Sequence, residues 1–178
     1  MRGLFSVDSK TQAQQAMPQI SLDWDTLKGA YPKRPLTGQL KAFMDHTPGT
    51  PCCVQMSHAL NLAGSYIGTR SNRRPNPRIP QSGTLYYLLA VDEMKWFLEQ
   101  NFGAGEEIST DDDGNRRSTQ DMKDVLNGRT GILVFSDLRF GTHTELWDVD
   151  HMHQRDMSSG LFRAPKVLFW DVMITATA

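Results

Sequence analysis

Residues 50–64, TPCCVQMSHALNLAG, hold the two cysteines of the chain side by side at the predicted start of a helix. Thr50 is a favoured N-cap residue, Pro51 is favoured at the first helical position, and Gly64 marks the C-terminal end. Cys52 then lies in the first turn, where free backbone N–H groups and the helix dipole lower the pKa of a thiol. We therefore expect Cys52 to be the reactive thiol of the pair.

Cys53 has a different predicted neighbourhood on the same helix. It lies with Met56, Leu60 and Ala63 at spacings of three and four residues, which is typical of a buried stripe. Burial of both cysteines in the core fits this spacing equally well, because free Cys is among the most buried residue types. A disulfide between neighbours would be strained, since their Cα atoms lie about 3.8 Å apart. Zinc sites usually space their cysteines by two to four residues.

The composition of the 178 residues indicates one globular domain with balanced charge. The 19 basic and 20 acidic residues give a formal net charge of −1, which supports neither a nucleic-acid partner nor a membrane-surface partner. No apolar run reaches transmembrane length, and the N-terminus lacks the apolar core of a signal peptide, so we expect no Sec-dependent export. Residues 1–20 are predicted to be a polar, mobile extension before one domain over residues 21–178.

Helical patterns come first along the chain and strand patterns come last. Helices are predicted over 21–32, 50–64, 92–103 (with Asp92 as N-cap) and 118–128. Runs of strand length occupy 84–91, 131–136, 142–149 and 165–174, whereas 68–83 and 103–117 are predicted to be loops. Residues 35–50 give no clear prediction. This order predicts an α+β fold in which N-terminal helices pack on a mostly antiparallel sheet.

His143 is the candidate base for a Cys52 thiolate. It lies in the alternating segment THTELW, where it shares one strand face with Glu145. A strand histidine that faces a helix N-terminus is how papain-like cysteine peptidases join nucleophile and base. An ordinary half-exposed strand histidine is the alternative. A metal site of His143, His151 and His153 is a further one, although short histidine pairs often arise by accident.

Asp156 is the candidate residue for orienting the imidazole. If the strand continues through a tight hairpin turn at Val149 and Asp150, residues equidistant from the turn face each other. Asp156 then stands opposite His143, at a separation that suits a carboxylate–imidazole hydrogen bond. An irregular loop after the turn would instead leave Asp156 in solvent.

The segments PCCVQMSHALN and GTHTELW resemble the nucleophile and histidine motifs of the type VI secretion amidase effectors of family 4, bacterial toxins with a papain-like fold. The resemblance covers roughly residues 22–172 and includes the segments YYLLAVDEMKWFLEQNFG, GILVFSD and KVLFWDV. Cys53 stands where the family motif has Ala, and Gln55 where it has Arg. Thr142 separates the motif glycine from His143.

The resemblance implies a peptidoglycan amidase that cleaves the bond between D-glutamate and meso-diaminopimelate. Cys52 would be the nucleophile and His143 its acid and base, with a thioester intermediate and no cofactor. The resemblance further implies delivery by the type VI secretion apparatus to the target-cell periplasm and a cognate immunity protein. Arginines of the 68–83 and 103–117 loops are expected to meet the diaminopimelate carboxylates.

Two other classes of function stay open on the sequence. One is a papain-like hydrolase or acyl transferase that acts on protein amides in a host cell. The other is a non-enzymatic binding domain in which both cysteines belong to the core.

Overall fold

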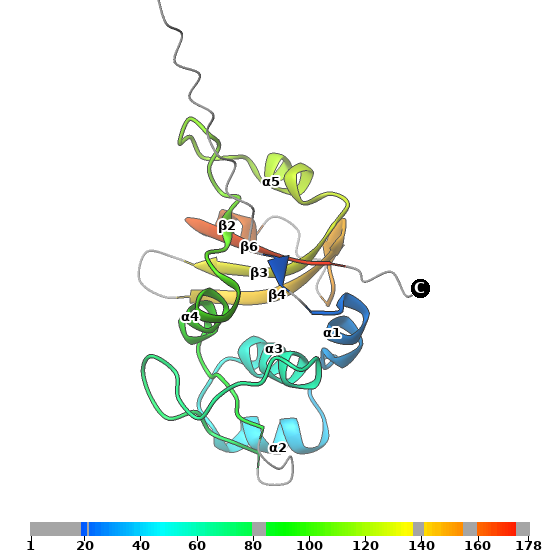
Figure 1. The fold of residues 1–178 in the computed structure, drawn as a ribbon, viewed down its shortest axis with the longest axis vertical. Coiled ribbons are helices and arrows are strands. Elements are labelled where there is room, and N and C mark those ends of the chain that lie inside the picture. Colours follow the sequence, from blue (N-terminus) through cyan, green and yellow to red (C-terminus); the bar gives the residue numbers. More distant parts are fainter. Residues whose placement is uncertain (1–18, 21, 80–84, 137–140, 155–159, 174–178) are drawn as a thin grey trace, which may run out of the picture.

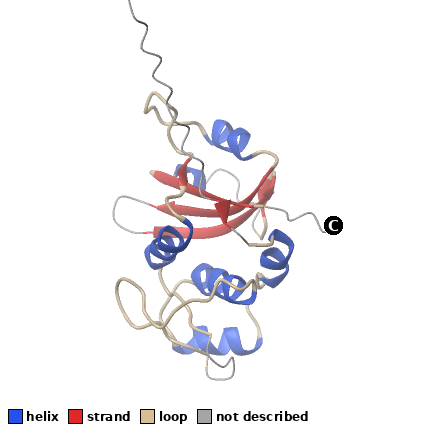
Figure 2. Cartoon of the chain, viewed as in Figure 1, coloured by secondary structure: helices blue, strands red, loops and turns tan. Residues whose placement is uncertain are grey.

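A β-sheet with helices on both faces forms the centre of the molecule (Figures 1 and 2). The computed structural model describes residues 19–20, 22–79, 85–136, 141–154 and 160–173. Its helices are α1 (Trp24–Ala30), α2 (Gly38–His46), α3 (Pro51–Leu62), α4 (Val91–Phe102), α5 (Thr119–Leu126) and the 3-10 helix η2 (Leu161–Arg163). Its strands are β1 (Gln19–Ile20), β2 (Glu106–Glu107), β3 (Arg129–Ser136), β4 (Gly141–Val149), β5 (His151–Met152) and β6 (Lys166–Val172).

The sheet follows the order β1-β6-β3-β4-β5, and β2 pairs with β6 beside this path. Every pairing in the described part of the chain is antiparallel except the short parallel contact of β1 with β6. The predicted α+β fold with a mostly antiparallel sheet is therefore confirmed. Because β5 is only two residues long, most of β4 forms an edge of the sheet, and α3 lies below this edge in Figure 1.

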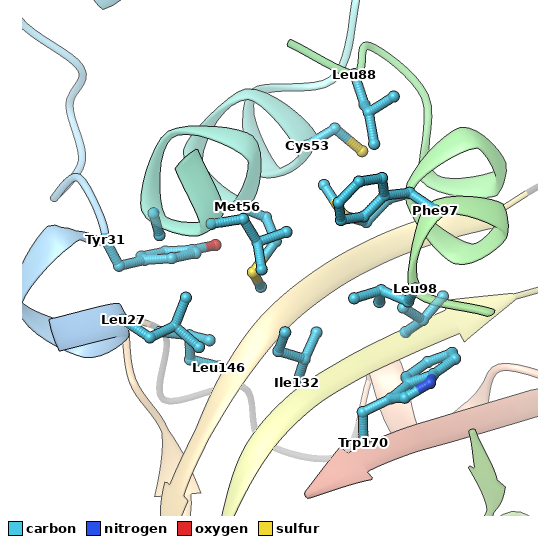
Figure 3. Close-up of a cluster of buried hydrophobic side chains, with 14 of the residues drawn as sticks. Leu27, Tyr31, Cys53, Met56, Leu88, Phe97, Leu98, Ile132, Leu146 and Trp170 are labelled. Carbon is cyan, nitrogen blue, oxygen red and sulfur yellow. The ribbon is translucent and has the colours of Figure 1, made fainter. Parts of the chain in front are cut away.

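Alternating side chains of the sheet build two separate cores. Ile132 and Val134 of β3 pack with α1, α3 and α4, whereas Leu133 and Phe135 face the side of α5 and η2. This alternation follows from the two-residue period of a strand. Figure 3 shows the first core, in which Cys53 lies beside apolar side chains from α4 and from the segment that precedes it.

The predicted strand over 84–91 is wrong. Residues 85–90 form an irregular segment in which Tyr86 makes one isolated bridge to Arg78, and Val91 already begins α4. Side chains satisfy the backbone groups of this segment: Asn61 Nδ2 donates to the Tyr86 carbonyl (2.8 Å), and the Leu88 N–H donates to Ser57 Oγ (3.0 Å). A strand partner is not needed, because α3 supplies the hydrogen bonds.

The structure differs from the sequence-based expectations at three smaller points. The N-cap of α4 is Ala90 rather than Asp92, and the N–H of Ala90 donates to the side chain of Glu93 (3.1 Å). The segment that gave no clear prediction contains α2. Residues 19–20 of the predicted mobile extension form β1 against β6, whereas 1–18 lie outside the described residues.

Candidate active site

The start of α3 is attached to the irregular segment before α4. The Thr50 N–H donates to the Leu89 carbonyl at 2.8 Å, and Thr50 Oγ1 donates to the same oxygen at 3.2 Å. Thr50 is the N-cap by position, as predicted, although its side chain caps no helical N–H. Gly64, with a φ of 90°, follows the helix end at Leu62. These contacts hold Cys52, the second residue of α3, at the edge of the sheet.

Cys52 meets His143 of β4, and each shifts the pKa of the other. Hydrogen bonding with Cys53 lowers the pKa of Cys52 most; hydrogen bonding with His143, its positive charge and the Thr144 backbone act in the same direction. Burial opposes them, and the pKa settles at about 4. Burial also lowers the pKa of His143, but the hydrogen bond with Cys52 and the charges of Cys52 and Glu145 raise it to about 9. At neutral pH this pair is a thiolate and an imidazolium.

Cys53 has the opposite environment. Its side chain is fully buried in the core beneath α3, and burial together with the adjacent Cys52 raises its pKa. The predicted stripe of Cys53 with Met56 and Leu60 is confirmed, since all three belong to the same core cluster. The two neighbouring thiols therefore differ in the ease with which they ionise.

Glu145 is the acidic side chain next to the imidazole. Its Oε2 lies 3.6 Å from His143 Nε2, and both side chains are less than one tenth exposed (4% and 8%). This separation is too long for a hydrogen bond, and His143 Nε2 is buried without a hydrogen-bond partner among the described residues. Glu145 thus acts on His143 through its charge. The sequence placed Glu145 on the face of His143, but its part in the site was not predicted.

Tyr31, directly after α1, completes this buried cluster. Its hydroxyl is buried without a hydrogen-bond partner among the described residues. Burial raises the pKa of Tyr31 most, and the nearby charges of Glu145 and Cys52 raise it further. The phenol therefore stays protonated beside the ion pair.

The predicted hairpin after β4 has the expected turn and register. Trp147 stands opposite Met152, and the His153 N–H donates to the Leu146 carbonyl at 2.8 Å, so the turn lies at Val149–Asp150. Asp156 falls outside the described residues, and its role stays a prediction.

Gln55, one turn after Cys52, joins α3 to two other segments. It is almost fully buried, its Oε1 accepts from Arg34 Nε (2.8 Å), and its Nε2 donates to Gln154 Oε1 (2.9 Å) and the Pro32 carbonyl (2.6 Å). Periodicity gave no sign of these contacts. The only signal in the sequence was that Gln55 stands where the family motif has Arg.

Four of the loop arginines that are expected to meet the substrate form contacts within the protein. Arg73 pairs with Asp92 and Arg74 with Glu93. Arg116 and Arg117 donate to backbone carbonyls, namely those of Phe162, Ala164 and Pro165 for the first and Ile108 and Thr110 for the second. These contacts hold the loops in place, and the meeting of loop arginines with the diaminopimelate carboxylates stays a prediction.

The histidines considered for a metal site are separated by their contacts. His151 bonds the exposed carboxylate of Asp150 (2.6 Å), and His153 packs edge-on against Tyr31. Within the described ranges, no three His, Cys, Asp or Glu side chains are grouped as metal ligands would be. The helices in these ranges also lack the length and apolarity needed to cross a membrane.

The fold and the site define a papain-like α+β protein in which a cysteine at a helix start meets a histidine on a strand. Residues 49–170 match the family described as type VI secretion system (T6SS), amidase effector protein 4. The chain belongs to this family, so the resemblance drawn from its motifs is confirmed and it is a type VI secretion amidase effector. No curated protein matches its sequence.

Solved structures of this family have the same fold. The effector Tae4 in the Tae4–Tai4 effector–immunity complex from Enterobacter cloacae matches with a TM-score of 0.61 at 18% identity, over 89% of this chain and 100% of that chain. Tae4 from Salmonella typhimurium, in complex with the immunity protein Tai4 from Enterobacter cloacae, matches with a TM-score of 0.63 at 17% identity, over 85% and 99%.

Proposed function

We propose that the protein hydrolyses the amide between D-glutamate and meso-diaminopimelate in peptidoglycan stem peptides, with Cys52 as nucleophile and His143 as acid and base. The observation that carries the proposal is the pairing of Cys52 and His143, with their pKa values at about 4 and about 9, in a chain of an amidase effector family. Such an ion pair supplies a nucleophile that is already ionised at neutral pH.

The reaction has two halves. The Cys52 thiolate attacks the γ-glutamyl carbonyl carbon, the C–N bond breaks, and His143 gives its proton to the leaving diaminopimelate amine. The neutral imidazole then takes a proton from water, whose oxygen attacks the thioester carbonyl and displaces the thiolate. The products are a D-glutamyl γ-carboxylate and a free amine, and the ion pair is restored.

The first turn of α3 stabilises the oxyanion. Cys52 is the second residue of the helix, so its backbone N–H has no acceptor within the helix. In this scheme the N–H donates to the carbonyl oxygen as negative charge develops there, and the positive end of the helix dipole adds to the effect.

In this scheme Asp156, which the hairpin register would bring opposite His143, orients the imidazole ring. Glu145 keeps the imidazole protonated through its negative charge. We further propose that the type VI apparatus delivers the protein to the periplasm of a target cell. A cognate immunity protein protects the producer, as the Tae4–Tai4 complexes of Enterobacter cloacae and Salmonella typhimurium suggest by analogy.

Digestion of purified diaminopimelate-type peptidoglycan, followed by mass spectrometry of the products, tests the cleavage. New D-glutamate and diaminopimelate termini are expected with the native chain and not with Cys52→Ala. Folded native protein that releases neither terminus would refute the cleavage, and activity on host protein amides would favour the alternative. A parallel digest with EDTA should be equally fast; loss of activity that zinc restores would implicate the three histidines.

A further inference from the structure

A recess of about 340 Å³ lies beside the candidate active site and is lined by Lys33, Arg34, His153 and Gln154. Lys33 and Arg34 follow α1, whereas the other two residues follow β5. Its described lining carries two cationic side chains, an imidazole and an amide, and no carboxylate. A volume of this size is within the range of small-molecule sites.

The recess is tied to the helix that carries Cys52. Gln55 lies three residues beyond Cys52, about 4.5 Å along the helix axis. It bonds Arg34 through one end of its amide and Gln154 through the other, at 2.8 and 2.9 Å. Two of the four lining residues are therefore held at fixed positions relative to the nucleophile. His153, the third, packs against Tyr31, which lies next to the ion pair.

The two cations of the recess have no carboxylate partner among the described residues. Lys33 and Arg34 are exposed, and neither forms an ion pair with a carboxylate in the described part of the chain. Lys28, a few residues earlier, shows the contrast: it pairs with Asp148 at 2.6 Å. Among the described residues, Gln55 occupies only Nε of Arg34, which leaves the terminal nitrogens of the guanidinium as a two-pronged donor.

We propose that this recess binds a free carboxylate of the substrate close to the amide that is cleaved. The proposal rests on the function proposed above, because the stem peptide carries one such group on the D-glutamyl α-carbon and another on the diaminopimelate side chain. Arg34 binds the carboxylate through its terminal nitrogens and Lys33 as a point charge. Burial holds the pKa of His153 below its usual range, so at neutral pH the imidazole contributes a hydrogen bond rather than a charge.

Calorimetric titration tests this site without turnover. Cys52→Ala protein is titrated with the tripeptide L-Ala-γ-D-Glu-diaminopimelate, amidated at its C-terminal carboxyl, and with two analogues of it. One analogue is further amidated at the D-glutamyl α-carboxyl and the other at the diaminopimelate side-chain carboxyl. Adding Arg34→Gln should weaken binding of the tripeptide about tenfold or more, as expected for a lost charge-assisted contact. Amidation of the carboxylate that the recess binds should weaken binding by the same factor, and Arg34→Gln should not weaken binding of that analogue further.

Arg163→Gln is the matched control, because Arg163 is an exposed cation of η2 on the other side of the sheet. It should bind all three peptides like the parent. The proposal is overturned if the tripeptide does not bind, if Arg34→Gln and Lys33→Gln leave its affinity within about twofold, or if they weaken all three peptides equally. If the tripeptide binds through Arg34 but the native chain cleaves no peptidoglycan, the proposed cleavage is refuted and the carboxylate site stands. If Arg34→Gln protein cleaves peptidoglycan with an unchanged KM, the carboxylate site is refuted and the proposed cleavage stands.

Discussion

At the scale of single residues, two neighbouring thiols acquire different chemistry although both are buried. Cys52 and Cys53 are 3% and 0% exposed, so accessibility does not separate them. The separation comes from the hydrogen bonds of Cys52 with Cys53 and with His143 and from the positive charge of His143, whereas burial in the apolar core raises the pKa of Cys53. A thiol is a strong nucleophile only as thiolate, so its neighbours rather than its exposure favour Cys52 as the proposed nucleophile.

Substitution of each thiol should therefore give different results. Cys52→Ala should abolish cleavage with the fold intact. Cys53→Ala should keep much of the activity and lower the free energy of unfolding by about 1 kcal/mol, since it removes one buried sulfur atom. Mass spectrometry after brief iodoacetamide treatment near neutral pH should find the label on Cys52 first. An active Cys52→Ala variant, or earlier labelling of Cys53, would reverse the assignment.

The pH dependence of kcat/KM should be bell-shaped, with limbs near the pKa values of about 4 and about 9. The thiolate forms as pH rises through the lower value, and the imidazolium is lost as pH rises through the upper one. Glu145→Gln removes a negative charge that raises the pKa of His143, so the upper limb should move down by about one unit. Glu99→Gln, a half-buried control on α4, should leave the profile in place. An unmoved limb in Glu145→Gln would show that this charge does not act on the imidazole.

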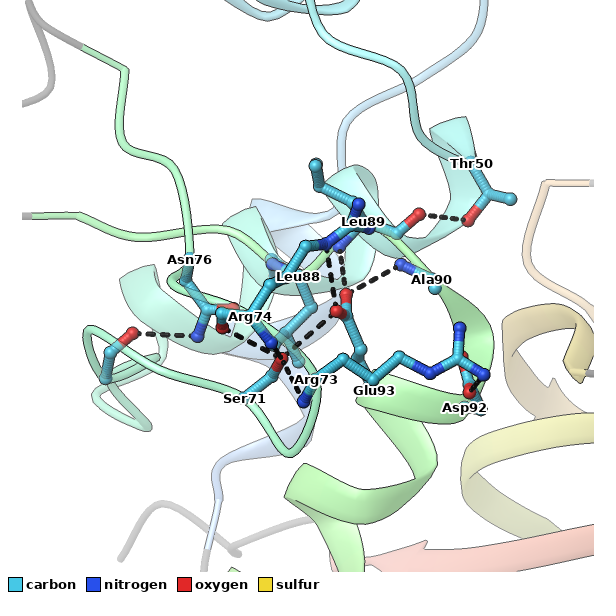
Figure 4. A network of polar contacts seen from close by, with 12 residues as sticks. Thr50, Ser71, Arg73, Arg74, Asn76, Leu88, Leu89, Ala90, Asp92 and Glu93 are labelled. Carbon is cyan, nitrogen blue, oxygen red and sulfur yellow. Dashed lines mark hydrogen bonds and ion pairs between the residues drawn. The ribbon is translucent and has the colours of Figure 1, made fainter.

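At the scale of elements, a buried carboxylate holds the segment that anchors the start of α3 (Figure 4). Glu93 is fully buried and accepts from the N–H groups of Leu89 and Ala90 at 3.0 and 3.1 Å. It also accepts from Ser71 Oγ (3.0 Å) and Arg74 Nε (3.1 Å). Because the Leu89 carbonyl receives the Thr50 N–H, the start of α3 depends on this network.

Glu93→Gln should destabilise the protein and reduce its activity together. The amide keeps one acceptor oxygen but loses charge-assisted hydrogen bonds, so the free energy of unfolding should fall by about 1–3 kcal/mol in urea titrations. Activity should fall at temperatures where the variant is still folded, since Thr50 loses its fixed acceptor. Glu99→Gln breaks only the surface pair with Lys95 and should cost less than about 1 kcal/mol. Equal effects of the two substitutions would argue against the network.

The hairpin of β4 and β5 gives a test of the orienting residue. Its register, with Asp148 opposite His151, brings position 156 opposite His143 if the pairing continues. Asp156→Asn should then lower kcat severely with the fold unchanged, as judged by circular dichroism. Asp150→Asn should do little, because Asp150 lies exposed at the turn and bonds His151. The opposite ranking would mean that the pairing ends before residue 156.

At the scale of the whole molecule, the site forms where the helical layer meets an edge of the sheet (Figure 1). β3 pairs with β4 on one side and packs Ile132 and Val134 against the helices on its first face. The same packing that builds this core therefore brings β4, with its histidine, alongside the start of α3. The recess after α1 forms at the same junction, which places a cationic surface next to the helix of Cys52.

The sequence by itself determined the elements that depend on neighbouring residues. Thr50, Pro51 and Gly64 predicted the limits of α3, and the alternation of THTELW predicted β4 and the turn after it. The class of fold and the family followed from these local patterns. Such signals can be read along the chain because capping, periodicity and turn formation act over a few residues.

Only the tertiary structure decided the chemistry of the site. The pKa values of Cys52 and His143 depend on burial and on charges that are distant in sequence, and the contact of Arg34 with Gln55 depends on how α1 packs on α3. Residues 85–90 have the composition of a strand, yet side chains of α3 and the Glu93 side chain of α4 bind their backbone groups. Hydrogen-bond partners and electrostatic neighbours are set by packing in three dimensions, which periodicity along one chain does not encode.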